Sequence, residues 1–395
     1  MPKILKKYNN IFLFIFLFYL IMGVSRYTQL LYFQANNNLE NFSISYSTMA
    51  ISGALSFLIT NQLPTNQSKY YIKTFIPIYS IGLLLRVFYN NSFIAALSGI
   101  LCGIGASVIL LLVRQWLLYL SAMDEKNKSF LQSSRFTIMQ TASIISTILA
   151  GILITILGKN NLAYILVLII SAITILLTLF ISIPSIQIPE RNKKFFNILP
   201  SNKTKGVKLY ILSVLLGISS SLIASILPAI IKGEGWSVLN TSLITTIATI
   251  LTLIFSFIFA LPKISKKPGL YFLGTQLIVI FFSLLIPLKL GINKTNIIFL
   301  TLLIETSLAG FYILKEMMEY SFIPKKESLM YLGLIQSSFL VGDSLGSLLG
   351  SYFYNNFGVN KLFILFGIIS FIATTLFTLF YKIQSKKINK LYKDL

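Results

Sequence analysis

The sequence predicts an all-α polytopic membrane protein, with twelve transmembrane helices arranged as two six-helix bundles. The chain has 395 residues, of which 55% are apolar and only 11% are charged. A soluble domain carries roughly 25% charged residues, so this chain lacks the polar surface that water would require. Apolar stretches of about 20 residues, the length that crosses a bilayer, occur twelve times. The longest polar stretch between them leaves six segments on either side.

The expected spans follow one another with mostly short polar connections. They cover residues 11–33, 42–60, 74–90, 93–121, 129–157, 162–183, 209–231, 239–261, 269–288, 295–321, 329–353 and 358–381. The first span resembles a signal peptide in position, but it lacks a small-residue cleavage site and contains Arg26. We therefore expect it to be retained as a helix.

The basic residues lie mainly on one set of connections. Of the 33 lysines and arginines, 23 fall in the N-terminus, in alternate loops and in the C-terminal tail, whereas the other loops hold five. This distribution follows the positive-inside rule and predicts cytoplasmic termini in a cell membrane. The formal net charge of +22 is thus explained by topology, and we expect no nucleic-acid partner.

Several residue types that enzymes use are missing or isolated. The chain has no histidine and a single cysteine, Cys102, which lies in an apolar stretch. This composition excludes an intrachain disulfide and any Ser-His or Cys-His catalytic pair, and it disfavours a transition-metal site. No GxxxxGK[ST] nucleotide-binding motif is present. We therefore expect a protein without cofactor or metal that is not an enzyme.

The two halves carry traces of an internal repeat. We expect an N-terminal bundle over 1–183, a basic cytoplasmic linker over 184–208, and a C-terminal bundle with a basic tail over 209–395. An offset of 200 residues pairs "ITILLTLF" (173–180) with "ATTLFTLF" (373–380), with five identities in eight, and also pairs Gly158 with Gly358. Such matches predict parallel repeats related by an axis along the membrane normal.

With this organisation the sequence resembles the major facilitator superfamily over essentially its whole length. The segment "GIGAS" (103–107) is similar to the family's glycine pattern in span four, and "LPKISKKPGL" (261–270) keeps a basic loop with a glycine. The loop 61–73 lacks the aspartate and glycine usual there, so the subfamily stays unassigned. The resemblance implies a rocker-switch transporter. In such a transporter, spans 1, 4, 7 and 10 line a cavity, spans 2, 5, 8 and 11 flank it, and the others face lipid.

Ionisable residues inside spans mark functional sites by default. Counting residues from the membrane surfaces places Arg26, Glu305 and Asp343 near mid-depth. We predict a substrate and proton site from these three, together with Gln29 and Tyr312. Asp343 adjoins a glycine ladder, Gly342, Gly346 and Gly350, whose spacing permits close approach of a neighbouring helix.

A second set of charges lies one to two helical turns from the expected cytoplasmic surface. It contains Arg114, Arg135, Lys315, Glu316 and Glu319. Lys315 and Glu319 are four residues apart and can pair on one helix face. We predict an inner gate from this set, with substrate binding as the alternative. Arg86, about four residues from the outer end of its span, is expected to extend to the interface.

The function predicted from these observations is secondary active transport, in the form of proton-coupled export of a small amphipathic or charged molecule. Without histidine, Asp343 or Glu305 would carry the proton. Two alternatives remain: uptake of a small anion held by Arg26 and Arg114, and movement of lipid by a flippase of the same fold. The expected partners are the small-molecule substrate, protons and membrane lipid, and the chain is expected to be a monomer.

Overall fold

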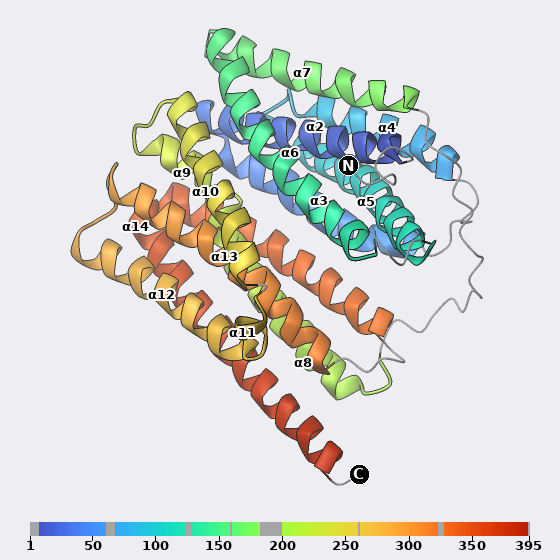
Figure 1. Ribbon diagram of the computed structural model, residues 1–395. Coiled ribbons are helices and arrows are strands. Elements are labelled where there is room, and N and C mark those ends of the chain that lie inside the picture. The colour runs from blue at the N-terminus through green and yellow to red at the C-terminus, as the bar shows by residue number, and fades with distance from the viewer. Residues whose placement is uncertain are drawn as a thin grey trace. The chain divides into compact units, whose positions relative to one another are not determined.

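The structure is a computed structural model that describes residues 8–60, 68–123, 128–158, 160–181, 200–259, 261–322 and 328–393. The described residues are almost entirely helical and contain no β-strand (Figure 1). Every expected span coincides with a helix over most of its length. In the described part of the chain, nine stretches of helix are long and apolar enough to cross a membrane, and the last of them, Leu334–Ser385, is 52 residues long. The predicted fold class is confirmed.

The chain divides into two compact units. The first comprises Met1–Lys194 with Ser237–Thr246, and the second comprises Phe195–Trp236 with Ile247–Leu395. Helices α2 (Asn9–Ala35), α3 (Leu39–Thr60), α4 (Ser68–Leu85), α5 (Ser92–Met123), α6 (Lys128–Ile156) and α7 (Asn161–Leu177) belong to the first unit. There, α2 packs on α6 and α7, while α5 packs on both α3 and α4.

The second unit is built mainly on one long pairing of helices. Its helices are α8 (Lys203–Ala224), α9 (Leu227–Gly233), most of α10 (Val238–Phe259), α11 (Pro262–Ser265), α12 (Pro268–Lys289), α13 (Asn296–Phe322) and α14 (Ser328–Lys393). Helix α14 covers two expected spans and changes direction at Gly358, whose φ is 78°. Extensive contact joins α8 to α14, and α12 packs on α13 and α14.

Local sequence explains where several helices begin and end. The side chain of Asn160 accepts a hydrogen bond of 2.9 Å from the Ala163 amide at the start of α7, which satisfies one of the free amides of the first turn. Gly158 and Gly358, the pair related by the 200-residue offset, both have positive φ, 103° and 78°. Glycine adopts this conformation at little cost, so the shared geometry supports the internal repeat.

Two expected features differ from the structure or lie outside it. The seventh span is not one continuous helix, because α8 ends at Ala224 and α9 begins at Leu227. Pro228 lies in the first turn of α9, where a missing amide hydrogen does least harm. Most of the expected linker lies outside the described residues, which resume at Pro200.

Aromatic residues fill the interior of both units. Phe14, Phe18 and Trp116 are almost fully buried in the first unit, and Phe272 and Phe377 in the second. Large apolar side chains are also exposed along the helices, among them Phe93, at 76%, and Phe180, at 83%. Exposed apolar side chains of this kind are expected where lipid rather than water surrounds the protein.

Candidate functional site

The glycine ladder of α14 forms the contact with α8. A Cβ atom added to Gly346 would lie 2.5 Å from the Ile218 carbonyl oxygen, and additions at Gly342 and Gly350 would meet the backbone of Val214 and Leu222. All three glycines therefore face α8, and the backbones of the two helices touch. The close approach expected from the spacing is confirmed, with α8 as the neighbouring helix.

Asp343 follows the first glycine of this ladder and is half-buried. Its amide nitrogen would lie 2.8 Å from a Cβ added to Gly217 of α8. The backbone that carries the carboxylate is thus held against α8. Any shift of α14 along α8 would move this carboxylate with it.

Glu305 and Tyr312 lie on α13 of the same unit. Glu305 is half-buried, and its backbone carbonyl accepts a 2.9 Å hydrogen bond from the Thr252 hydroxyl of α10. Tyr312 is 46% exposed and packs edge-on against Phe311 and Phe339, with ring centroids 5.4 and 6.3 Å away. This cluster offers an aromatic surface beside a phenol hydroxyl, which suits an amphipathic ligand.

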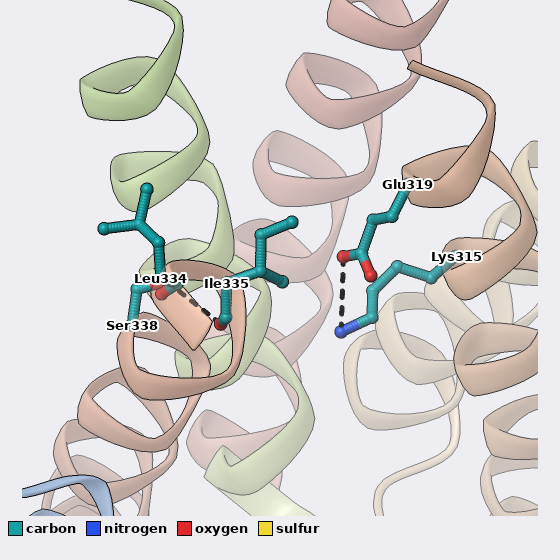
Figure 2. A network of polar contacts seen from close by, with 5 residues as sticks. All are labelled: Lys315, Glu319, Leu334, Ile335 and Ser338. Carbon is teal, nitrogen blue, oxygen red and sulfur yellow. Dashed lines mark hydrogen bonds and ion pairs between the residues drawn. The ribbon is translucent and has the colours of Figure 1, made fainter. Parts of the chain in front are cut away.

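Lys315 and Glu319 form a buried ion pair on α13 (Figure 2). The Lys315 Nζ atom lies 3.7 Å from a Glu319 carboxylate oxygen, and both side chains are at most 10% exposed. The same Nζ atom lies 4.1 Å from the centre of the Phe339 ring on α14, within the range of a cation–π interaction. Glu316 points elsewhere and is exposed. Within this unit, the charge pair therefore links α13 to α14.

The first unit holds the other predicted site residues. Gln29 is buried and donates a 3.0 Å hydrogen bond to the Ser45 hydroxyl, which joins α2 to α3. Arg26 is exposed, and its guanidinium lies 4.7 Å from the centre of the Tyr46 ring. Arg135 is half-buried on α6, and Arg114 lies on α5 with its side chain outside the described part. Convergence of Arg26 with Glu305 and Asp343, which belong to the second unit, remains a prediction.

Arg86 corrects one of the sequence-based expectations. It is only 3% exposed, and it donates to the Ser25 hydroxyl at 2.9 Å and to the Met49 sulfur at 3.9 Å. The expectation that this side chain extends to the interface was wrong, because the guanidinium turns inward to polar and sulfur acceptors on α2 and α3. The sequence contains a pattern that indicates burial of Arg86. Ile76, Tyr79, Leu83 and Arg86 recur at helical spacing, and the first three are fully buried.

No group of three or more acidic, cysteine or histidine side chains suited to a metal ion occurs in the described ranges.

Comparison with known proteins adds to this picture. Residues 209–392 match the family model described as Major Facilitator Superfamily. A crystal structure of the nucleoside transporter NupG superposes with a TM-score of 0.68 over 94% of this chain and 98% of that chain, at 16% sequence identity. The residues that match the family model make up just under half of the chain, so this part of the chain is similar to the major facilitator superfamily, and the whole chain shares the fold of the solved transporter.

A bacterial homologue of the human lysosomal transporter Spinster, in an inward-facing and occupied conformation, has the same fold. Its TM-score is 0.66, its identity 11%, and the alignment covers 94% of this chain and 96% of that one. No curated protein matches the sequence. The family match over residues 209–392 and the shared fold support a multi-pass membrane transporter.

Proposed function

We propose that this chain is a transporter of the major facilitator superfamily, and that it exports a small amphipathic or charged molecule in exchange for protons. The observation that carries the proposal is the half-buried carboxylate of Asp343, fixed beside the backbone contact of α8 with α14. A carboxylate is the group that can change charge here, because the chain has no histidine. Burial favours its protonated form, and a nearby arginine favours the ionised form.

Substrate transport is coupled to proton transfer if the protonated and ionised forms of Asp343 favour different conformations of the transporter. In this scheme Asp343 is ionised when Arg26 is near, and it takes up a proton when Arg26 is distant or paired with substrate. Each cycle then moves a proton against substrate across one carboxylate. Glu305 is the second candidate for this role, because it is also half-buried on α13. The inner gate would comprise Lys315, Glu319 and their neighbours.

The proposed substrate class rests on aromatic side chains of the second unit and on an arginine of the first unit. The exposed ring of Tyr312 against Phe339 provides an apolar surface, and Arg26 provides a charge that a polar group can bind. The basic loops support a topology with both termini in the cytoplasm. Under this orientation the Lys315–Glu319 pair lies toward the cytoplasmic end of α13.

Uptake of a small anion is the second candidate function. It is favoured by the composition of the first unit, whose expected spans contain four arginines and no acidic residue. Arg26 and Arg114 would hold the anion. A radiolabelled lipid assay separates both schemes from lipid movement.

The test is transport in proteoliposomes with an imposed pH gradient. Asp343→Asn keeps the size of the side chain and mimics its protonated form. We expect it to retain substrate binding and exchange but to lose uphill transport. Glu305→Gln is run in parallel, and Glu40→Gln, an exposed carboxylate in the first turn of α3, is the matched control. Full gradient-driven transport by Asp343→Asn would refute the assignment of Asp343 as the proton-coupling residue. Loss of uphill transport in Glu305→Gln alone would assign proton coupling to α13 instead.

A further inference from the structure

The described part of the first unit contains a buried positive charge, Arg86, with no acidic side chain paired to it. Arg86 lies just after α4, is 3% exposed, and has a guanidinium that cannot lose its proton in a protein. Between Glu40 and Asp124 the sequence has no acidic residue. Glu40 itself is exposed in the first turn of α3. An uncompensated charge costs several kcal/mol where water is excluded.

The hydrogen bonds of Arg86 do not satisfy it. A guanidinium has five N–H groups, and those of Arg86 reach the neutral Ser25 hydroxyl on α2 and the Met49 thioether on α3. They also reach the buried Cys102 thiol on α5. Thioether and thiol sulfurs are both weak acceptors. The Nε atom is buried and has no partner. Native proteins rarely leave buried donors unsatisfied, and such a donor indicates a missing ion, water or ligand.

A second buried donor lies near the first. The Tyr79 hydroxyl on α4 is completely buried, has no hydrogen-bond partner, and lies within electrostatic range of Arg86. Tyr79 and Arg86 are seven residues apart, two helical turns, so they share one face of the chain. The Ser25 hydroxyl accepts from Arg86 and keeps its own proton for donation. This part of the first unit therefore offers several N–H and O–H donors and one positive charge.

We infer that this junction of α2, α3, α4 and α5 is a binding site for a small monovalent anion. The ligand is either a halide or the carboxylate group of a larger solute. Arg86 supplies the charge, and Tyr79 and Ser25 supply further donors. The Met49 side chain, unbranched and flexible, moves aside for the anion. The site lies wholly within the first unit and does not depend on the proposed direction of transport or on Asp343.

Anion-dependent thermal unfolding of the purified full-length chain tests this inference. Chloride and formate are compared with isethionate, a bulky sulfonate, at equal ionic strength. We expect chloride, formate or both to raise the melting temperature. At one hundred times the dissociation constant, the unfolding equilibrium constant should fall about 100-fold. An effect of chloride identifies a free ion as the ligand. An effect of formate alone identifies a carboxylate group. Arg86→Gln should abolish the anion effect.

Arg86→Gln removes a buried group, and a variant that failed to fold would give no melting temperature. A second variant keeps the inference testable in that case. Met49→Glu places a carboxylate beside the Arg86 guanidinium, and this carboxylate should replace the bound anion as its counter-charge. It should melt higher than Met49→Gln without added anion and respond to neither chloride nor formate. Met49→Gln, neutral and of the same size, should keep the response. Two results would overturn the inference: identical melting of the unmodified protein in all three salts, or Met49→Glu melting below Met49→Gln in isethionate.

Discussion

The contact between α8 and α14 gives the sharpest prediction about packing. In Gly346→Ala the new Cβ atom would lie 2.5 Å from the Ile218 carbonyl oxygen and 2.9 Å from the Ile218 Cα atom. Ordinary van der Waals contact begins at about 3.4 Å, and backbone atoms cannot rotate out of the way as a side chain can. The two helices must therefore separate by about 1 Å along this part of the contact.

The energetic consequence follows from overpacking. Forcing one extra carbon into a close-packed contact costs typically about 1–3 kcal/mol, and separation of the helices also weakens the dispersion contacts next to the substitution. Alanine has a better helix propensity than glycine by about 1 kcal/mol, which offsets part of this loss. We expect a net destabilisation of about 1–2 kcal/mol, and reduced transport because Asp343 is displaced with its helix.

The measurement is reversible denaturant unfolding of the detergent-solubilised protein, combined with transport. Gly274→Ala is the matched control, because Gly274 also lies within a helix, α12, and nothing lies within 4 Å of an added Cβ atom there. The control should be as stable as the unmodified protein or slightly more so. Equal stability of Gly346→Ala and Gly274→Ala would refute the reasoning, since it would mean that α8 and α14 are not in backbone contact.

Three further predictions concern charge and backbone geometry. Lys315→Ala leaves Glu319 buried without its partner, so we expect the folded protein to lose about 3 kcal/mol of stability. The accessibility of cysteines introduced at the two ends of the membrane-spanning helices should also change. Unchanged accessibility together with lost substrate binding would place Lys315 in the substrate site. Burial raises the pKa of Glu234, just after α9, so the folded protein holds this proton more tightly than the unfolded chain. The associated stability is present below the usual glutamate pKa of about 4.3 and is lost as pH rises through the folded value; Glu234→Gln should remove this loss, and parallel stability curves for both proteins from acid to neutral pH would contradict it. Gly358→Ala forces alanine into φ 78° and ψ 173°, a conformation that costs about 1–3 kcal/mol, and an unchanged unfolding midpoint would show that the bend is elsewhere.

Hydropathy and residue spacing predicted most of the fold. A membrane span needs a run of apolar residues, so its existence can be recognised locally, and each expected span coincides with a helix. The glycine ladder likewise predicted a close contact, because small residues four apart lie on one face. The identity of the neighbouring helix, α8, could not be predicted in this way, since it depends on how distant segments pack.

The errors arose at helix ends. The apolar run of the third span continues to residue 90, but α4 ends at Leu85, so Arg86 lies outside the regular helix. The break between Ala224 and Leu227 was missed for a similar reason, because Pro228 is compatible with the start of a helix as well as with a kink within one. Hydropathy averaged over about 20 residues does not resolve either feature.

The polar site was predicted in part. Spacing alone indicated the Lys315–Glu319 pair, because residues four apart on a helix are neighbours. Its enclosure by Phe339 is a tertiary contact between α13 and α14, and the sequence gives no local sign of it. Glu316 differs from its neighbour Lys315 by one position, about 100° around the helix, and this rotation is why it is exposed.

The ionisable residues of the expected spans differ in sign between the two halves. Arg26, Arg86, Arg114 and Arg135 are all cationic, whereas Glu305, Glu316, Glu319 and Asp343 of the second half are opposed by Lys315 and by Lys361 near the start of the last span. A low-dielectric environment penalises an excess of positive or of negative charge, and how that charge can be neutralised depends on the chemistry of the side chain. A carboxylate can be neutralised by a proton, but an arginine cannot give up its own. The second half therefore suits protons as exchangeable partners, while in the first half the buried Arg86 is the group for which we infer an anion that enters from outside the chain.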